Sequence, residues 1–284
     1  MTEYTPPKVL INAENFRKVI FQLLLVAISI ADLFPIYYVI VTSFKTHPEY
    51  LHNLFGPPIS PTFDNFQQAL IQGNLLLWFR NSVIMTVTTV TIVTLICSAA
   101  AFATSKMEFK GRKALLRILV SLMIMPPVVM IIPLFLLMVR VGLINNFLGV
   151  IIIYSGLLAP FSVYLLNSFF GTIQDEILAA ASIDGCSTFQ IFRYIVLPLS
   201  GPAITTQVVV NGLWVWNELM ISLIFLQGND IRTLMPGLTQ FQGRFTINQP
   251  LIMAGALLGM LPVMLLYLVG QKYFVRGLTA GAVK

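Results

Sequence analysis

Six apolar segments, each long enough to cross a bilayer as a helix, dominate this sequence. They cover residues 19–44, 81–105, 118–139, 143–170, 203–226 and 251–270. Four of the six carry no charged residue, and the exceptions are Asp32 in the first and Glu218 in the fifth. Because open strands leave backbone groups unpaired in lipid, these segments are expected to be helices. The predicted fold class is therefore all-α, a polytopic membrane protein with six transmembrane helices.

The low charge content supports this assignment. Charged residues make up 10% of the chain, against roughly 25% in soluble domains, and hydrophobic residues reach 57%. A water-soluble globule would have too few charges for its surface, and a disordered chain would have far less apolar area to bury. The net charge of +6 is interpreted as a signal of membrane orientation, so no nucleic acid is expected as a partner.

Basic residues are unevenly distributed between the two sides of the six segments. With both termini on one side, that side holds 12 of the 17 Lys and Arg residues, and the other side holds 5. Because cytoplasmic loops carry the excess of Lys and Arg, both termini are predicted to be cytoplasmic. The expected organisation is a cytoplasmic segment at 1–18, a transmembrane domain at 19–274 and a cytoplasmic tail at 275–284.

The cytoplasmic segment 172–201, between the fourth and fifth apolar segments, carries the strongest local signal. A run of helix formers at 174–183 begins with Asp175 and Glu176, and acidic side chains suit a helix N-terminus. Gly185 can end this helix in the left-handed conformation. The sequence therefore predicts one short helix followed by a bend.

A second short helix is predicted after the bend. Ser187 or Thr188 can cap its N-terminus, and Pro198 is expected to stop it. Three- and four-residue spacing places the following apolar side chains on one face: Phe189, Phe192 and Ile195 or Val196.

A patch of small side chains lies on the first of these helices, at Ala179, Ala180 and Ala181. Small side chains allow another surface to approach closely, which favours docking into a groove of a partner protein. The alternative is an amphipathic helix on lipid headgroups, which would show basic residues along its polar face. Arg193 is the only basic residue of this segment, against three acidic residues that include Asp184. Docking to a protein is therefore the favoured interpretation.

The run A-A-A-S-I-D-G at 179–185, followed by Ile195, Leu197 and Pro198, resembles the EAA loop of ABC importer permeases. That family's pattern is E-A-A-x-x-x-G and then I-x-L-P at the same spacing. Other landmarks are similar to the carbohydrate branch, which includes the maltose permease subunits. They are T-S-F-K at 42–45, Pro126, Pro133, Gly142 with Leu143, W-N-E at 216–218 and the run from Phe274 to Lys284. The resemblance extends over nearly the whole chain.

The resemblance implies a type I importer permease that forms half of a sugar pathway in the cytoplasmic membrane. The implied partners are a second permease in a pseudo-two-fold heterodimer, two ATPase subunits and an extracytoplasmic sugar-binding protein. The segment 172–201 would transmit motion from the ATPases. Its implied coupling residues are Glu176, Ala179, Ala180, Ala181, Asp184, Gly185, Ile195, Leu197 and Pro198.

One position departs from the family pattern. Ala179 stands where the EAA motif has a glutamate, so the ion pair that this acid forms with an ATPase is not expected here. Glu176 lies three residues earlier, about one helical turn. The hypothesis is that Glu176 substitutes for the missing acid.

No source of energy is encoded in this chain. It contains no Gly-Lys dipeptide and hence no G-x-x-x-x-G-K-[ST] phosphate loop, so ATP and Mg are expected on the partner ATPase and no cofactor on this chain. An ion-coupled transporter would place several ionisable groups in the bilayer. A membrane-embedded lipid enzyme would need a cluster of catalytic groups, whereas His47 and His52 share one loop. Both remain alternatives, and no catalytic or metal site is predicted.

Several weaker features have two interpretations each. Glu218, with Trp214, Trp216 and Asn217, forms either part of a sugar pathway or an interfacial belt. The prolines of the third segment make either a hinge or a fixed kink. The outer loop 227–250 either connects two segments or reaches into a binding protein. The tail, with Gly277 and Gly281, is expected to be flexible and, by resemblance, to contact the ATPase dimer.

Overall fold

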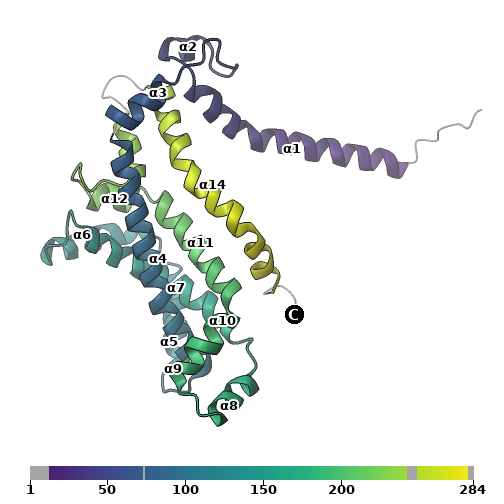
Figure 1. Ribbon diagram of the computed structural model, residues 1–284, viewed down its shortest axis with the longest axis vertical. Coiled ribbons are helices and arrows are strands. Elements are labelled where there is room, and N and C mark those ends of the chain that lie inside the picture. The colour runs from purple at the N-terminus through teal and green to yellow at the C-terminus, as the bar shows by residue number, and fades with distance from the viewer. Residues whose placement is uncertain (1–12, 73, 242–247, 281–284) are drawn as a thin grey trace, which may run out of the picture.

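The computed structural model describes residues 13–72, 74–241 and 248–280, and within these ranges the regular structure is entirely helical (Figure 1). The prediction of an all-α chain is confirmed. The longest helices are α1 (Ala13–Ser43), α4 (Leu75–Lys106), α7 (Phe147–Phe170), α11 (Gly201–Asn217) and α14 (Gln249–Ala280). Since α1 begins at Ala13, the predicted boundary between residues 18 and 19 falls inside this helix.

Helices α4 and α7 pack along one another and form the centre of the bundle, and α11 packs against both. Their shared core is apolar and includes Met85, Tyr154 and Leu166. Helix α14 covers α11, whereas α1 leaves the bundle and projects away from it (Figure 1). The short helices at one end of the bundle are α2 (His47–His52), α3 (Asp64–Gln67) and η1 (Gln68–Gln72).

The T-S-F-K motif at 42–45 fixes this end of the bundle. The ammonium group of Lys45, which is fully buried, donates to the carbonyl oxygens of Asn53 at 2.6 Å and Leu54 at 3.3 Å. The side-chain amide of Asn65 donates to the carbonyl oxygens of Ser43 and Lys45. These bonds hold the loop after α1 against the end of that helix.

The sequence predicts one continuous helix over 118–139, the third apolar segment. In the structure this segment is broken. It divides into α5 (Arg112–Leu122) and α6 (Pro127–Arg140), whose axes differ by 102°. Pro126 and Pro127 cause the break, because a residue that precedes proline is driven from helical to extended geometry. Pro126 accordingly has φ −64° and ψ 130°. Pro133 lies inside α6 without ending it.

The fifth segment, predicted as one helix over 203–226, is also divided. Helix α11 ends at Asn217 and α12 (Met220–Phe225) follows after Glu218 and Leu219. The loop after α12 contains α13 (Leu234–Leu238) and η3 (Thr239–Phe241), and residues 242–247 lie outside the described residues.

Three described helices, α1, α4 and α7, are long and apolar enough to cross a membrane. Two bent helix pairs raise the number to five if each counts as one span. The described apolar part of α14 is shorter, at Gln249–Leu265. The six-span count therefore stays a prediction.

Gly149 and Gly156 on α7 provide a test of this packing. A Cβ atom on Gly149 would collide with the backbone carbonyl oxygen of Leu143, whereas one on Gly156 would meet nothing within 4 Å. We expect Gly149→Ala to lower the free energy of unfolding by about 2 kcal/mol through overpacking. Gly156→Ala should instead leave it unchanged or raise it by up to about 1 kcal/mol. Thermal denaturation of the detergent-solubilised variants would measure the difference, and equal midpoints would contradict it.

Candidate functional site

The segment after α7 folds into two short helices that protrude at the opposite end of the bundle from α2 (Figure 1). They are α8 (Asp175–Ile183) and α9 (Thr188–Ile191). Gly185 has φ +85°, the left-handed conformation that the sequence predicts for it. The Ser187 side chain caps α9 and forms a capping box with Gln190, in which the backbone N–H of Ser187 donates to Oε1 of Gln190 at 2.7 Å. The bend therefore has a defined local geometry.

The prediction that Pro198 stops the second helix is wrong. Helical winding continues from α9 through a π-helical turn, η2 (Phe192–Val196), into α10 (Leu197–Leu199), where Pro198 lies in the first turn. The first turn of a helix does not require the N–H that proline lacks, so Pro198 is tolerated at this position. The chain then turns by 77° at Ser200 into α11.

Most side chains of α8 and α9 are exposed. Ala179 and Ala180 face solvent with Glu176, whereas Ala181 is buried. The other predicted coupling residues divide in the same way: Asp184, Gly185 and Pro198 are exposed, and Ile195 and Leu197 are half-buried.

Large apolar side chains accompany the alanine patch. Ile183, Phe189 and Tyr194 are 87%, 70% and 71% exposed. Phe192, Ile195 and Val196 share a face that packs on the core, as predicted, but Phe189 does not join them, and Ile191 is buried there instead. An exposed surface that combines large apolar side chains with small ones has the chemistry of a protein docking surface.

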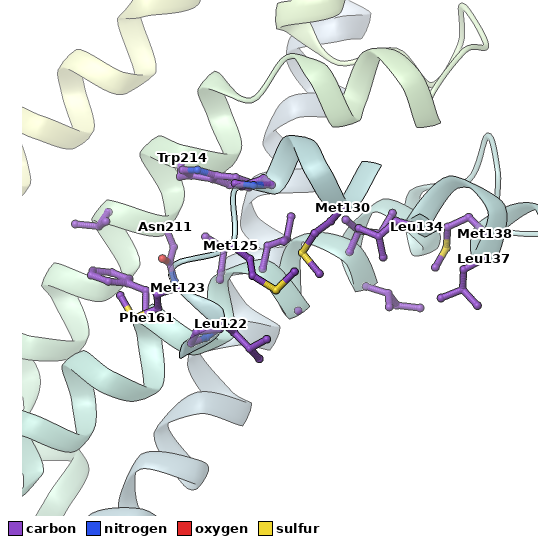
Figure 2. A pocket seen from close by; sticks show the side chains of 18 residues that line it. Leu122, Met123, Met125, Met130, Leu134, Leu137, Met138, Phe161, Asn211 and Trp214 are labelled. Carbon is purple, nitrogen blue, oxygen red and sulfur yellow. The ribbon is translucent and has the colours of Figure 1, made fainter. Parts of the chain in front are cut away.

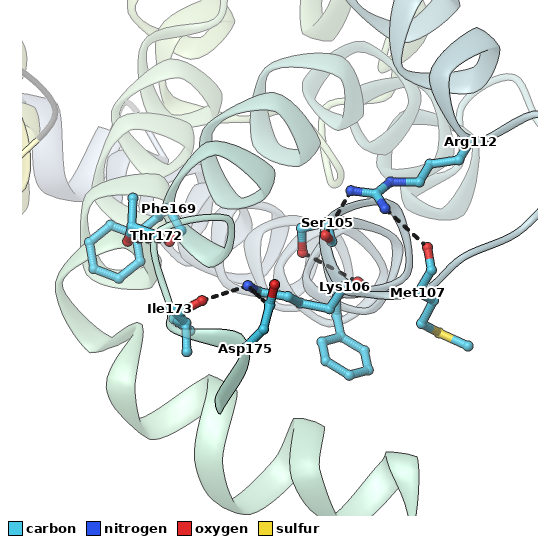
Figure 3. A network of polar contacts seen from close by, with 9 residues as sticks. Ser105, Lys106, Met107, Arg112, Phe169, Thr172, Ile173 and Asp175 are labelled. Atoms are coloured by element: carbon cyan, nitrogen blue, oxygen red, sulfur yellow. Dashed lines mark hydrogen bonds and ion pairs between the residues drawn. The ribbon is translucent and has the colours of Figure 1, made fainter. Parts of the chain in front are cut away.

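Lys106, at the C-terminal end of α4, anchors α8 to the bundle (Figure 3). Its side chain is 6% exposed, and its ammonium group donates to the carbonyl oxygen of Ile173 and to Oδ1 of Asp175, both at 2.6 Å. A second cation, Arg112, donates from Nε to the carbonyl oxygen of Thr104 at 2.6 Å and from its guanidinium to that of Ser105 at 2.8 Å. Arg112 thereby caps the last turn of α4.

Sequence reasoning did not find this anchor. In the sequence, Lys106 is one of the 12 basic residues on the predicted cytoplasmic side, and nothing else distinguishes it. Its partners Ile173 and Asp175 lie 67 and 69 residues away in the chain. A lysine directly after an apolar helix gives no local indication of a partner at that separation.

The four residues proposed for a sugar pathway do not form one site. Trp214 packs edge to face on Tyr154, with ring centroids 5.4 Å apart. Trp216 points to the other side of α11, where its indole N–H donates to the carbonyl oxygen of Gly259 on α14 at 3.2 Å. Asn217 is exposed, and its side chain donates to the carbonyl oxygen of Leu213 in its own helix.

Glu218 lies at the break between α11 and α12 and binds the start of α12. Its Oε1 accepts from the backbone N–H of Ile221 at 2.9 Å, and its Oε2 accepts from that of Ser222 at 3.0 Å. The hydroxyl of Tyr154 donates to the same Oε2 at 2.6 Å. This carboxylate therefore caps a helix and joins it to α7.

The predicted tail residues are only partly described. Helix α14 runs to Ala280, so Gly277 lies in a helix rather than in a flexible tail, and Gly281 lies outside the described residues. Within the described part of the chain, no three His, Cys, Asp or Glu side chains are grouped so that they could hold a metal ion.

Comparison with known proteins identifies the family to which this arrangement belongs. Residues 92–280, more than half of the chain, match the model of the binding-protein-dependent transport system inner membrane component. The chain belongs to this family. The predicted membership is confirmed, and the protein is a membrane permease subunit of a transport system rather than an enzyme.

Relatives of this permease are similar over almost their full length. It is 37% identical to a putative ABC transporter permease protein, ORF2, of Caldicellulosiruptor sp. (strain Rt8B.4), covering 94% of this chain and 97% of that protein. It is 34% identical to the melibiose/raffinose/stachyose import permease protein MelC of Bacillus subtilis, covering 93% of this chain and 96% of MelC.

The fold also matches a solved structure. The permease superposes with a TM-score of 0.83 on a chain of a bacterial ABC transporter involved in the import of the acidic polysaccharide alginate. The superposition covers 95% of this chain and all of that chain, at 22% sequence identity. The fold is thus that of an ABC importer permease.

Proposed function

We propose that this permease is one of two membrane subunits of an ATP-driven, binding-protein-dependent importer of oligosaccharides. The observation that carries the proposal is that α8 and α9 protrude with exposed apolar side chains. Lys106 fixes this element to the central helix α4. A rigid contact of this kind transmits force, whereas a loose loop would absorb it. The proposal includes six membrane crossings with both termini and the α8–α9 element on the cytoplasmic side.

In this mechanism one of the two ATPase subunits binds the exposed surface of α8 and α9, and the other binds the second permease. ATP binding brings the ATPases together and moves α8, and the Lys106 anchor passes this motion to α4. The bundle then alternates between inward- and outward-open arrangements, and hydrolysis resets it. The C-terminal stretch of the sequence that contains Gly277 and Gly281 is proposed to contact the ATPase dimer.

The projecting helix α1 is proposed to pack against the second permease. Large apolar side chains are exposed around it, from Val19 to Ile40, and none of its apolar window is buried within this chain. The acidic Asp32 is also exposed. A carboxylate on a membrane helix is costly when it faces lipid, so a partner subunit with a polar group at that depth is the expected neighbour.

The substrate class comes from the relatives. MelC is named for the import of melibiose, raffinose and stachyose, and we expect this permease to import sugars of similar size. An extracytoplasmic sugar-binding protein would deliver them to the outer end of the bundle, near α2 and the loop that holds α13.

The proposal is tested by cross-linking and uptake. A photo-reactive cross-linker on Ser182→Cys, in the exposed part of α8, is expected to capture an ATPase subunit in intact cells. Deleting the chain should abolish ATP-dependent uptake of at least one of raffinose, stachyose and maltotriose. Capture of no ATPase would contradict the proposal, and uptake driven by an ion gradient without ATP would favour an ion-coupled transporter.

Glu176 provides a finer test of the docking surface. Because Ala179 has no carboxylate, exposed Glu176 is proposed to pair with a basic residue of the ATPase. We expect Glu176→Ala to lower uptake and sugar-stimulated ATP hydrolysis together, by about three- to fivefold, as for one partly screened ion pair. Glu176→Gln should behave similarly, because it also removes the charge. Unchanged uptake in both variants would exclude Glu176 as the substitute.

A further inference from the structure

Basic side chains gather at the corner between α4 and α5, at the end of the bundle that carries α8 and α9 (Figure 1). Residues 106–117 contain five Lys and Arg residues and one acidic residue, Glu108. The corner surrounds a hollow of about 400 Å³, whose wall includes Glu108, Arg112, Lys113 and Arg117. The wall of this hollow therefore carries a net positive charge.

Two of these cations have donor groups without a partner. The guanidinium of Arg112 is occupied, because it caps the last turn of α4 (Figure 3). Lys113 and Arg117 are exposed, and within the described part of the chain no carboxylate pairs with either of them. Nε of Arg117 donates to the carbonyl oxygen of Lys113 at 3.3 Å. The terminal nitrogens of Arg117 and the ammonium group of Lys113 therefore remain free to bind an anion.

The local electrostatics are unfavourable without an anion. Helix α5 begins with Arg112 and Lys113 and has no acidic residue in its first turn. Positive side chains are disfavoured at a helix N-terminus, so these two residues add to the positive potential of the helix end. Glu108 is exposed and forms no ion pair among the residues that the structure describes. An anion bound between the cations would relieve their mutual repulsion.

The surface of α5 is divided between charged and apolar side chains. Leu116 and Leu119 pack on the core of the bundle. With about 100° between successive residues, Lys113 and Arg117 share one flank of the helix. The opposite flank carries exposed apolar side chains, namely Leu115, Ile118 and Leu122. A basic flank beside an exposed apolar flank is typical of a helix that meets lipid at the membrane surface.

The position of the two cations along the chain matches the headgroup level of a bilayer. The segment from Ile118 to Val139 contains no charged residue. Lys113 lies five residues before Ile118, about 7.5 Å along the helix. The headgroup region on each side of the hydrocarbon core is about 5–8 Å thick. Lys113 and Arg117 therefore lie beside the lipid phosphates when Ile118 enters the hydrocarbon.

The larger hollow at the other end of α5 does not have this chemistry. It has a volume of about 470 Å³ and is lined mostly by apolar side chains, including Leu122, Met125 and Trp214 (Figure 2). None of its described lining residues is charged. An anionic group is therefore attracted to the start of α5 and not to its end.

We propose that the hollow at the start of α5 binds the phosphate of an anionic phospholipid through Lys113 and Arg117. The terminal nitrogens of Arg117 suit two phosphate oxygens, and Lys113 supplies a point charge. The inference rests on the orientation in the proposed function, which assigns the lipid to the cytoplasmic leaflet, but not on the transported sugar. Anionic lipids of this leaflet attract basic clusters next to a membrane helix. Because Arg112 both lines the hollow and caps α4, the bound lipid would lie close to the Lys106 anchor.

The site is tested by photo-labelling of the assembled importer in phosphatidylcholine nanodiscs. A trace of photo-reactive phosphatidylglycerol is compared with a photo-reactive phosphatidylcholine that has the same acyl chains. The label is quantified on chymotryptic peptides that cover residues 107–122. We expect phosphatidylglycerol to label these peptides at least about fivefold more than phosphatidylcholine. Equal labelling by the two lipids would overturn the proposal.

Substitutions locate the site within the patch. Lys113→Gln combined with Arg117→Gln should lower the phosphatidylglycerol labelling about tenfold, since each cation near the surface attracts anionic lipid. Lys113→Arg combined with Arg117→Lys keeps both charges and should lower it less than about threefold. Arg80→Gln combined with Arg140→Gln is the matched control, because it removes two exposed cations on the predicted outer side, and labelling should not change. Equal losses in the control and the first pair would reduce the effect to net charge and overturn the site.

Two other occupants of the patch would give different results. Inorganic phosphate, added at constant ionic strength, should not displace the label, and complete displacement would assign the hollow to a soluble phosphate instead. Suppose that the two lipids label the unsubstituted complex equally and that removing both cations releases the ATPase subunits. The patch would then be a protein contact, and the lipid site would be overturned. Sugar uptake enters none of these measurements, so failure of the lipid site and failure of the proposed function are distinguishable.

Discussion

Replacing Lys106 by methionine is expected to uncouple the transporter, lowering ATP-driven sugar uptake at least fivefold while ATP hydrolysis persists. Methionine fills the space of the aliphatic stem but cannot donate to Ile173 or Asp175. A hydrogen bond from a charged donor contributes about 1.5–3 kcal/mol, and a change of one or two kcal/mol shifts an equilibrium by about 5- to 30-fold. Helix α8 would then move without α4. Uptake and ATP hydrolysis measured on the same proteoliposomes would show the separation.

Asp175→Asn is the matched control for this prediction. Since the Asp175 side chain is 83% exposed, its ion pair with Lys106 contributes no more than about 1 kcal/mol. The bond from Lys106 to the Ile173 carbonyl remains in this variant, so uptake should fall less than about threefold. Equal losses in the two variants would show that the ion pair alone forms the anchor, and normal uptake in Lys106→Met would exclude the anchor altogether.

Replacing Glu218 by alanine is expected to destabilise the fold more than any other single change at the proposed pathway residues. The carboxylate accepts hydrogen bonds from Ile221, Ser222 and Tyr154. Their loss should cost about 3 kcal/mol, or about 6–12 °C in the midpoint of thermal unfolding. Thermal denaturation of the purified protein, followed by size-exclusion chromatography, would measure the shift.

Two further variants show whether Glu218 is structural or part of the sugar pathway. Asn217→Ala changes the exposed neighbour and should shift the midpoint by less than about 2 °C, as for a surface substitution. Glu218→Gln keeps one carbonyl acceptor, so its shift in the unfolding midpoint should lie between those of Asn217→Ala and Glu218→Ala. A Glu218→Ala protein with an unchanged midpoint and no uptake would instead show that the carboxylate acts on the solute.

Sequence reasoning predicted the local geometry of the α8–α9 bend but not the arrangement of the side chains at 214–218. The difference has a physical reason. The bend at 184–187 was predicted correctly because a left-handed glycine and a serine cap act over three or four residues. The side chains of Trp214, Trp216, Asn217 and Glu218 do not come together, since successive side chains in a helix point about 100° apart. Trp214 and Trp216 therefore point to different neighbours, and Glu218 serves the helix that begins after it.

The breaks between α5 and α6 and between α11 and α12 also depend on contacts that local sequence does not reveal. The prolines of the third segment predict a hinge or a kink, but they do not predict the 102° angle between α5 and α6. A proline removes a donor and restricts its predecessor, whereas the packing of α5 against α7 decides where the next helix goes. The break at Glu218 has no proline, and its signal is a single acid that both caps α12 and meets Tyr154.

The sequence by itself determined the class of this protein, its helical content, its family and the local form of the α8–α9 bend, because hydropathy, caps and glycines act over short distances. Only the tertiary structure decided which distant groups meet. Lys106 reaches Ile173, Asn211 joins Ser162 at a separation of 49 residues, and Glu218 joins Tyr154 at 64. Inside an apolar bundle each buried polar group needs a partner, and the helix packing determines which partner is available.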